Sequence, residues 1–258
     1  MPRTFRITPA RVRSDDRLDL TEHLGELRHR LIVSALALVI AFGGMYAIHD
    51  RLIEVLTWPL PADHQKLITL SPTEPFFITL KVCFWASILV ALPVWLYQVY
   101  AYVIPAVSDQ PRRIMIAIVT GLAGLFAAGV AFGYVVVLPV ALNFLTGFGG
   151  DTFNTQLRAG DYFSFATSLL LASGIMFEVP IAMAALARIG VASATIYRQQ
   201  WRIAIVAMAA IAAVLPGGDP ISMGLLMIPQ FVLYGLGIAL AAKFGQAPIW
   251  RRTDFDTA

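Results

Sequence analysis

The chain has 258 residues, of which 58% are hydrophobic and only 14% are charged. A soluble domain carries about 25% charged residues, so this composition excludes an ordinary soluble protein and predicts an integral membrane protein. The single cysteine, Cys83, excludes an internal disulfide framework. The formal net charge of +3 is better explained by membrane topology than by nucleic-acid binding, which we do not expect.

The first predicted element is an amphipathic helix at residues 19–31, DLTEHLGELRHRL. The residues before it are polar and arginine-rich, unlike a cleavable signal, so we expect the first apolar segment to be retained. Leucines at positions 20, 24, 27 and 31 form an apolar stripe that runs into that segment. Two interpretations remain open for the polar face. It is a solvated surface with an ion pair between Glu26 and Arg30, or Glu26 receives a cation from a ligand at the membrane surface.

Six apolar segments predict six membrane spans, at residues 31–48, 77–104, 114–139, 162–187, 201–215 and 221–242. The first four have the length of about 20 residues that a bilayer requires. The fifth would be about 22 Å long as a helix, shorter than a hydrocarbon core of about 30 Å. We therefore expect the last two spans to form a short helical hairpin. The outer loop 49–76 is long enough for a short helix and an ordered cap.

Lysine and arginine indicate the orientation of these spans. Fifteen of them fall in the first thirty residues, in the loops after the second and fourth spans, and at the C-terminal end. The opposite loops hold only Arg51, Lys66 and Arg158. The positive-inside rule places both termini in the cytoplasm. The expected fold is an all-α integral membrane protein, a concave bundle of six transmembrane helices with both termini inside and short fifth and sixth helices.

Several residues within the spans are unusual for a lipid environment. Gly129 and Gly133 form a small-xxx-small pair that predicts close helix packing. Pro180 predicts a kink near Met176. Two positions before this proline, Glu178 would cost about 2.5–3.5 kcal/mol as a charged group at mid-helix. It is either a neutral glutamic acid bonded to a freed carbonyl or a functional group on a concave face, and Gln98 carries the same ambiguity.

Two other classes of function are weighed against these features. A proton- or ion-coupled small-molecule transporter would use Glu178 at the membrane midplane, but we detect no internal repeat of the kind common in such folds. An intramembrane enzyme would need a Ser–His pair, an Asp pair or a metal cluster, and the spans contain none of these patterns. We therefore expect no enzyme activity, no metal and no cofactor.

Five stretches occur in an order and register that resemble the TatC family, the polytopic receptor subunit of the twin-arginine protein translocase. They are HLGELRHRL (23–31), SPTEPFFITLK (71–81), LPVWLYQVYAYVIPA (92–106), FEVP (177–180) and PGGDPISM (216–223). The resemblance runs from about residue 20 to 243. It implies one TatC-like membrane domain over 1–258, with a six-helix bundle at 19–243 and cytoplasmic tails at 1–18 and 244–258.

The resemblance also implies a function and partners. A TatC-like protein binds twin-arginine signal peptides of folded cargo and organises their transport across the bacterial-type cytoplasmic membrane, driven by the proton-motive force. Its expected partners are TatA- and TatB-like single-span subunits, further copies of itself, and membrane lipid.

The site residues implied by the resemblance begin with Glu26, the first acidic recognition position, and its neighbours Leu27 and Arg28. The family typically places a second glutamate before two arginines in the first cytoplasmic loop. Here the loop reads SDQPRR (108–113), so Arg112 and Arg113 are in place but Pro111 occupies the glutamate position. Asp109 could substitute for it. Otherwise the chain is a diverged paralogue with altered recognition.

The remaining implied positions lie in the spans and at the outer face. The intramembrane polar and partner-docking positions are Gln98, Tyr102, Glu178 and Pro180. The outer positions with structural or functional roles are Pro59, Glu74 and Asp219. Leu215 and Met223 stand where the family often has polar side chains near a partner subunit's helix.

Overall fold

The computed structural model describes residues 15–61, 66–103, 112–148, 156–214 and 220–245, and these residues are predominantly helical. The extended pairing described there is one isolated bridge between Ile68 and Arg158. The all-α fold class predicted from the sequence is therefore confirmed. In chain order the elements are α1 (Asp15–Ala47), α2 (His49–Thr57), α3 (Glu74–Val103), α4 (Arg112–Phe132), a π-helical segment η2 (Gly133–Val137), α5 (Leu138–Gly147), α6 (Ala159–Phe177), α7 (Val179–Arg188), α8 (Ala194–Gln199), α9 (Trp201–Val214) and α10 (Pro220–Phe244).

Among the described residues, five helical stretches are long and apolar enough to cross a membrane. They are Gly25–Ala47, Glu74–Val99, Val119–Gly147, Ala159–Arg188 and Met223–Phe244. The predicted fifth span corresponds to α9, whose apolar part, Trp201–Ala213, is a shorter helix. A 14-residue helix such as α9 is about 21 Å long, so the expectation of a short fifth helix is met. The expectation of a short sixth helix is not, because α10 has 25 residues.

The predicted end of the third span at residue 139 is wrong. The third span combines α4, η2 and α5 and continues to Gly147. Pro139 lies in the first turn of α5, where its missing N–H removes no bond from the following turns. The wider π turn just before it, Gly133–Val137, accommodates the proline ring without ending the helix.

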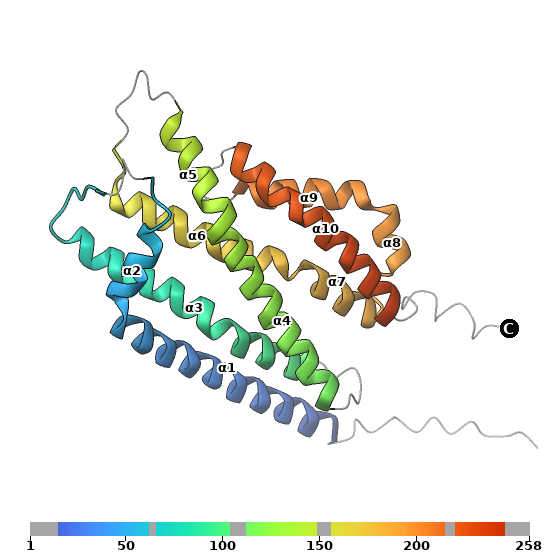
Figure 1. Cartoon of the computed structure of the whole chain (residues 1–258). Coiled ribbons are helices and arrows are strands. Elements are labelled where there is room, and N and C mark those ends of the chain that lie inside the picture. Colours follow the sequence, from blue (N-terminus) through green and yellow to red (C-terminus); the bar gives the residue numbers. More distant parts are fainter. Residues whose placement is uncertain (1–14, 62–65, 104–111, 149–155, 215–219, 246–258) are drawn as a thin grey trace, which may run out of the picture.

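The long helices lie side by side (Figure 1). Small residues and hydrogen bonds between neighbouring spans account for these pairs. α1 lies antiparallel on α3, with the Trp95 indole N–H donating to the Ser34 carbonyl at 2.9 Å. None of the residues in the apolar window of α1 is buried, so this helix lies at the edge of the described bundle. α10 runs parallel to α7, since a Cβ at Gly237 would lie 3.2 Å from the Cα of Pro180 and one at Gly245, just after α10, would lie 3.1 Å from the Cβ of Ala187.

The glycine pair of the third span packs as predicted. A Cβ on Gly129 would lie 2.6 Å from the Ser173 carbonyl oxygen, and one on Gly133 would lie 2.7 Å from the Ser173 hydroxyl. Cβ atoms essentially never approach other atoms so closely, so only glycine lets α4 and η2 contact α6 at this distance. This contact positions the third span against the fourth.

The two ends of the bundle differ in charge. The start of α1, the end of α3, the start of α4, the end of α7 and the end of α10 lie at one end, which we call the basic end (Figure 1). Its described part carries Arg28, Arg30, Arg188, Arg198 and Lys243. The opposite end, which we call the α2 end, carries α2 and the starts of α3 and α6. Because α1 begins and α10 ends at the same end, the chain crosses the bundle an even number of times.

Candidate functional sites at the basic end and within the bundle

The candidate recognition site at the basic end is built by α1 and α3. The Glu26 side chain on α1 is 43% exposed, and Arg30, one turn further on, is 18% exposed. Arg30 donates to Oε1 of Glu26 through Nε at 2.9 Å and through Nη2. The same guanidinium donates through Nη1 to Oε1 of Gln98 on α3, at 3.2 Å. The ion pair predicted from the i, i+4 spacing is confirmed, and Gln98 is joined to it.

The other predicted recognition residues are only partly described. Leu27 and Arg28 are exposed on α1, next to Glu26 in the sequence. Arg112 and Arg113 begin α4, and Tyr102 lies in the last turn of α3, but the side chains of these three residues lie outside the described part. Asp109 falls outside the described residues altogether, so its substitution for the missing glutamate stays a prediction.

The fourth span breaks at Glu178, between α6 and α7. The Glu178 N–H donates to the Ile175 carbonyl at 3.0 Å, a bond of the tighter three-residue kind. Pro180 lies buried in the first turn of α7, so the kink predicted for this span is confirmed. Both carboxyl oxygens of Glu178 are buried, and within the described part of the chain neither has a hydrogen-bond partner. The interpretation of Glu178 as an acid bonded to a freed carbonyl is therefore wrong.

A second buried polar group was not predicted from the sequence. Gln230 in α10 is 2% exposed, and its amide oxygen and nitrogen have no hydrogen-bond partner among the described residues. The available signal was a glutamine beside Pro229 in an otherwise apolar span. The apolar parts of the fourth and sixth spans thus each contain one buried, unpartnered polar side chain.

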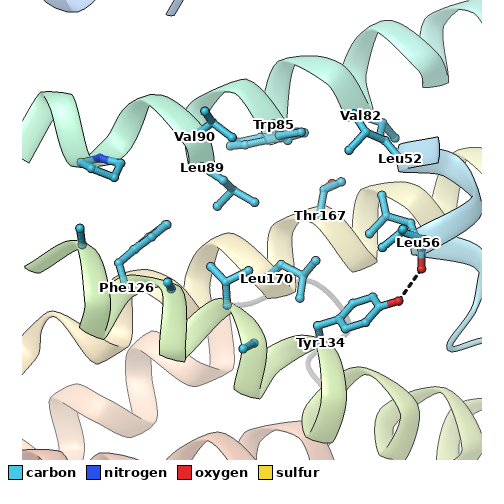
Figure 2. A pocket seen from close by; sticks show the side chains of 17 residues that line it. Leu52, Leu56, Val82, Trp85, Leu89, Val90, Phe126, Tyr134, Thr167 and Leu170 are labelled. Carbon is cyan, nitrogen blue, oxygen red and sulfur yellow. Dashed lines mark hydrogen bonds between the residues drawn. The ribbon is translucent and has the colours of Figure 1, made fainter. Parts of the chain in front are cut away.

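An apolar cleft of about 440 Å³ opens between α3 on one side and α4 and α6 on the other (Figure 2). Its walls are hydrophobic apart from Thr167, the Trp85 indole and the Tyr134 hydroxyl, which donates to the Val55 carbonyl at 2.6 Å. Labelled in Figure 2 are Leu52, Leu56, Val82, Trp85, Leu89, Val90, Phe126, Tyr134, Thr167 and Leu170. A cleft of this composition fits a hydrocarbon chain or an apolar helix face.

Glu74 forms a clamp at the α2 end. Its Oε1 accepts from Nε of Arg158 and its Oε2 from the Leu70 N–H, both at 2.8 Å. Ile68 adds two backbone bonds to the segment that enters α6. The clamp therefore ties the start of α3 to the start of α6. Pro59 lies half-buried after α2, and Asp219 falls outside the described residues.

These features define a class of protein: a polytopic membrane protein with an exposed carboxylate among basic residues at one end and a polar break inside one span. The family model described as Sec-independent protein translocase protein (TatC) matches residues 22–229. The chain therefore belongs to the TatC family.

Relatives and solved structures agree with this assignment. The chain is 33% identical over 237 residues to a TatC protein of Desulforapulum autotrophicum, covering 91% of this chain and 88% of the relative. It is 36% identical over 230 residues to the chloroplastic TATC of Arabidopsis thaliana, covering 89% and 67%. A crystal structure of the twin-arginine translocase receptor TatC aligns with a TM-score of 0.76 and 35% identity, covering 85% of this chain and 99% of the other. These matches favour the translocase over the transporter hypothesis.

Proposed function

We propose that this chain is the receptor subunit of a twin-arginine translocase, and that it binds signal peptides with paired arginines at its basic end. The observation that carries the proposal is the half-exposed Glu26 carboxylate on α1, in a chain similar to a solved twin-arginine receptor. A carboxylate can hold a planar guanidinium through two parallel hydrogen bonds, which gives arginine an advantage over lysine.

The binding site in this proposal extends from Glu26, Leu27 and Arg28 on α1 to the loop before α4. Asp109 takes the place of the missing loop glutamate, followed by Arg112 and Arg113. A shorter carboxylate two positions from the expected one would receive the second arginine of the ligand at a different angle. This arrangement favours a narrower range of signal peptides than a glutamate at position 111 would accept.

The bundle supplies the partner surfaces in the same proposal. The apolar cleft of Figure 2 and the kinked span with Glu178 accept apolar helices, those of TatA- and TatB-like single-span subunits and of the signal peptide. Residues 1–258 act as one membrane domain without a catalytic role, associate with further copies, and use the proton-motive force. The basic end faces the cytoplasm, as the excess of lysine and arginine there supports.

Site-specific photo-crosslinking tests this proposal. A crosslinker at position 27 and another at position 109 should each capture a twin-arginine signal peptide and fail to capture its Lys–Lys version. The same crosslinker at position 198, which is exposed at the basic end but away from Glu26, serves as the control. Equal capture of both peptides at position 27 would contradict the proposal. If the twin-arginine peptide is captured only after the substitution Pro111→Glu, the natural chain has lost the recognition of paired arginines that is usual in the family.

A further inference from the structure

The carboxylate proposed to receive the ligand is already occupied within the chain. Two nitrogens of Arg30 donate to the same oxygen, Oε1 of Glu26. Arg30 follows Glu26 by one helical turn, so the helix holds it within reach of this carboxylate. A ligand free in solution has no such tether and competes at a lower effective concentration. An incoming arginine therefore meets a neutral ion pair instead of a bare negative charge, and it has to displace or share the resident guanidinium.

Two further observations distinguish this pair from an ordinary surface ion pair. Arg30 is only 18% exposed, and it donates at 3.2 Å to Gln98, which lies 68 residues away on a different span. Gln98 gives Arg30 a second acceptor that remains when Glu26 is taken by another donor. Both of these Arg30 nitrogens reach Oε1 of Glu26, so a ligand can engage Oε2 before Arg30 leaves Oε1.

From this geometry, and on the basis of the proposed function, we infer that Arg30 is a specificity-determining residue. It occupies Glu26 in the ligand-free chain and yields the carboxylate to a ligand guanidinium while its own hydrogen bond to Gln98 holds it in place. A ligand lysine is a strongly hydrated point charge that cannot form two parallel bonds to a carboxylate. It competes poorly against a tethered arginine, so Arg30 makes the site reject lysine more strongly than Glu26 alone would.

Binding of fluorescent peptides to the full-length protein in nanodiscs tests this role. The peptides are a twin-arginine signal and its Lys–Lys version, and the variants are Arg30→Gln and, as a matched control, Arg198→Gln. Both variants remove one basic charge at the same end of the bundle, but Arg198 is exposed on α8, away from the site. We expect Arg30→Gln to strengthen Lys–Lys binding and to lower the ratio of Arg–Arg to Lys–Lys affinity by roughly two- to fivefold, the range that a partly exposed ion pair supports.

Two more variants keep the test decisive if Arg30→Gln fails to fold. Arg30→Lys retains the charge but competes as an ammonium, so the affinity ratio should fall part of the way. Gln98→Leu removes the second acceptor, so Arg30 should hold Glu26 more firmly and Arg–Arg binding should weaken while the Arg198→Gln control binds as wild type. The inference would be overturned by a wild-type Arg–Arg to Lys–Lys ratio in the Arg30 variants that fold, or by wild-type Arg–Arg binding in Gln98→Leu.

The failure of this inference is distinguishable from the failure of the proposed function. If the wild-type chain prefers the twin-arginine peptide but Arg30→Gln weakens both peptides equally, Arg30 only positions Glu26, and the inference alone is overturned. If the wild-type chain binds both peptides equally or binds neither, the proposed receptor function is overturned and the inference with it.

Discussion

At the scale of single residues, two glutamates show opposite environments. Glu74 at the α2 end accepts hydrogen bonds on both carboxyl oxygens, from Arg158 and from the Leu70 N–H. Glu178 has both oxygens buried without a partner within the described residues. A buried polar atom that makes no hydrogen bond costs about 1–3 kcal/mol of stability. Retention of such a group is typical of a position selected for function, where stability is given up.

We predict that Glu178→Met leaves the melting temperature of the purified protein unchanged or raises it. Methionine has a similar volume and carries no polar atom that would stay unpaired, so the substitution can recover part of the roughly 1–3 kcal/mol. Translocation of a twin-arginine reporter should fall at the same time. The same substitution at Glu74 serves as the comparison, because it removes two acceptors and should lower the melting temperature. A clear loss of stability in Glu178→Met would show that this carboxyl has a partner.

Local spacing predicted the residue-scale contacts only when the partners were near in sequence. The Glu26–Arg30 pair follows from an i, i+4 separation on one helix, so it could be predicted. The bond from Arg30 to Gln98 joins residues 68 positions apart, and it depends on how α1 and α3 align. For Glu178 the sequence left two interpretations open, a bond to a freed carbonyl or a functional group on a concave face, because side-chain direction in a broken helix does not follow from local spacing.

At the scale of helices, small residues determine which spans come close. The described part of α4 carries three glycines that face different surroundings. A Cβ at Gly129 would collide with the Ser173 carbonyl and with Phe177, whereas one at Gly124 would meet nothing within 4 Å. Gly121 has ordinary contact distance to Ile181. The close α4–α6 contact therefore requires a glycine on the side of α4 that carries Gly129, and not on the side that carries Gly124.

We predict that Gly129→Ala destabilises the protein by about 1–3 kcal/mol, the usual cost of overpacking, because the Ser173 backbone cannot move aside without shifting α6. Gly124→Ala is the matched control. It adds the same methyl group to the same helix in open space, and it should be neutral or stabilise by up to about 1 kcal/mol through helix propensity. Thermal unfolding in detergent followed by circular dichroism measures both. Equal melting temperatures for the two variants would contradict the close α4–α6 contact.

The helices themselves were mostly predictable because long apolar runs have few alternatives in a bilayer. The predicted third span stopped at residue 139, eight residues before the end of the helix at Gly147. A proline ends a helix only if the turn before it cannot adjust, and the π segment Gly133–Val137 provides that adjustment. No local pattern in GYVVV distinguishes a π turn from an α turn, so the extension to Gly147 required the packing of the whole span.

At the scale of the molecule, charge and connectivity give the same topology. α1 is antiparallel to α3, which runs parallel to α6, since Glu74 contacts Arg158 and Lys81 contacts Ser164. α7 continues α6 and is parallel to α10. The start of α1 and the end of α10 therefore share the basic end.

We predict that a cysteine at position 198 is protected from a membrane-impermeant maleimide in intact cells and becomes labelled after the membrane is permeabilised. A cysteine at position 51, at the α2 end, should be labelled from outside without permeabilisation. The native Cys83 is fully buried and should contribute no background, so no cysteine-free parent is needed. Labelling of position 198 from outside would reverse the proposed orientation.

The clamp between Glu74 and Arg158 also limits how the spans can move. It joins the starts of α3 and α6 at one point, so any swing of α3 away from α6 has its pivot at the α2 end. From Glu74 to Gln98 the lever arm is about 36 Å, so a rotation of about 5° displaces the far end by about 3 Å. That displacement equals the length of one hydrogen bond, and it falls where Gln98 meets Arg30. Because α1 is bonded along α3, a small hinge motion at the α2 end would carry Glu26, Arg30 and Gln98 together, as one group, relative to α6 at the basic end.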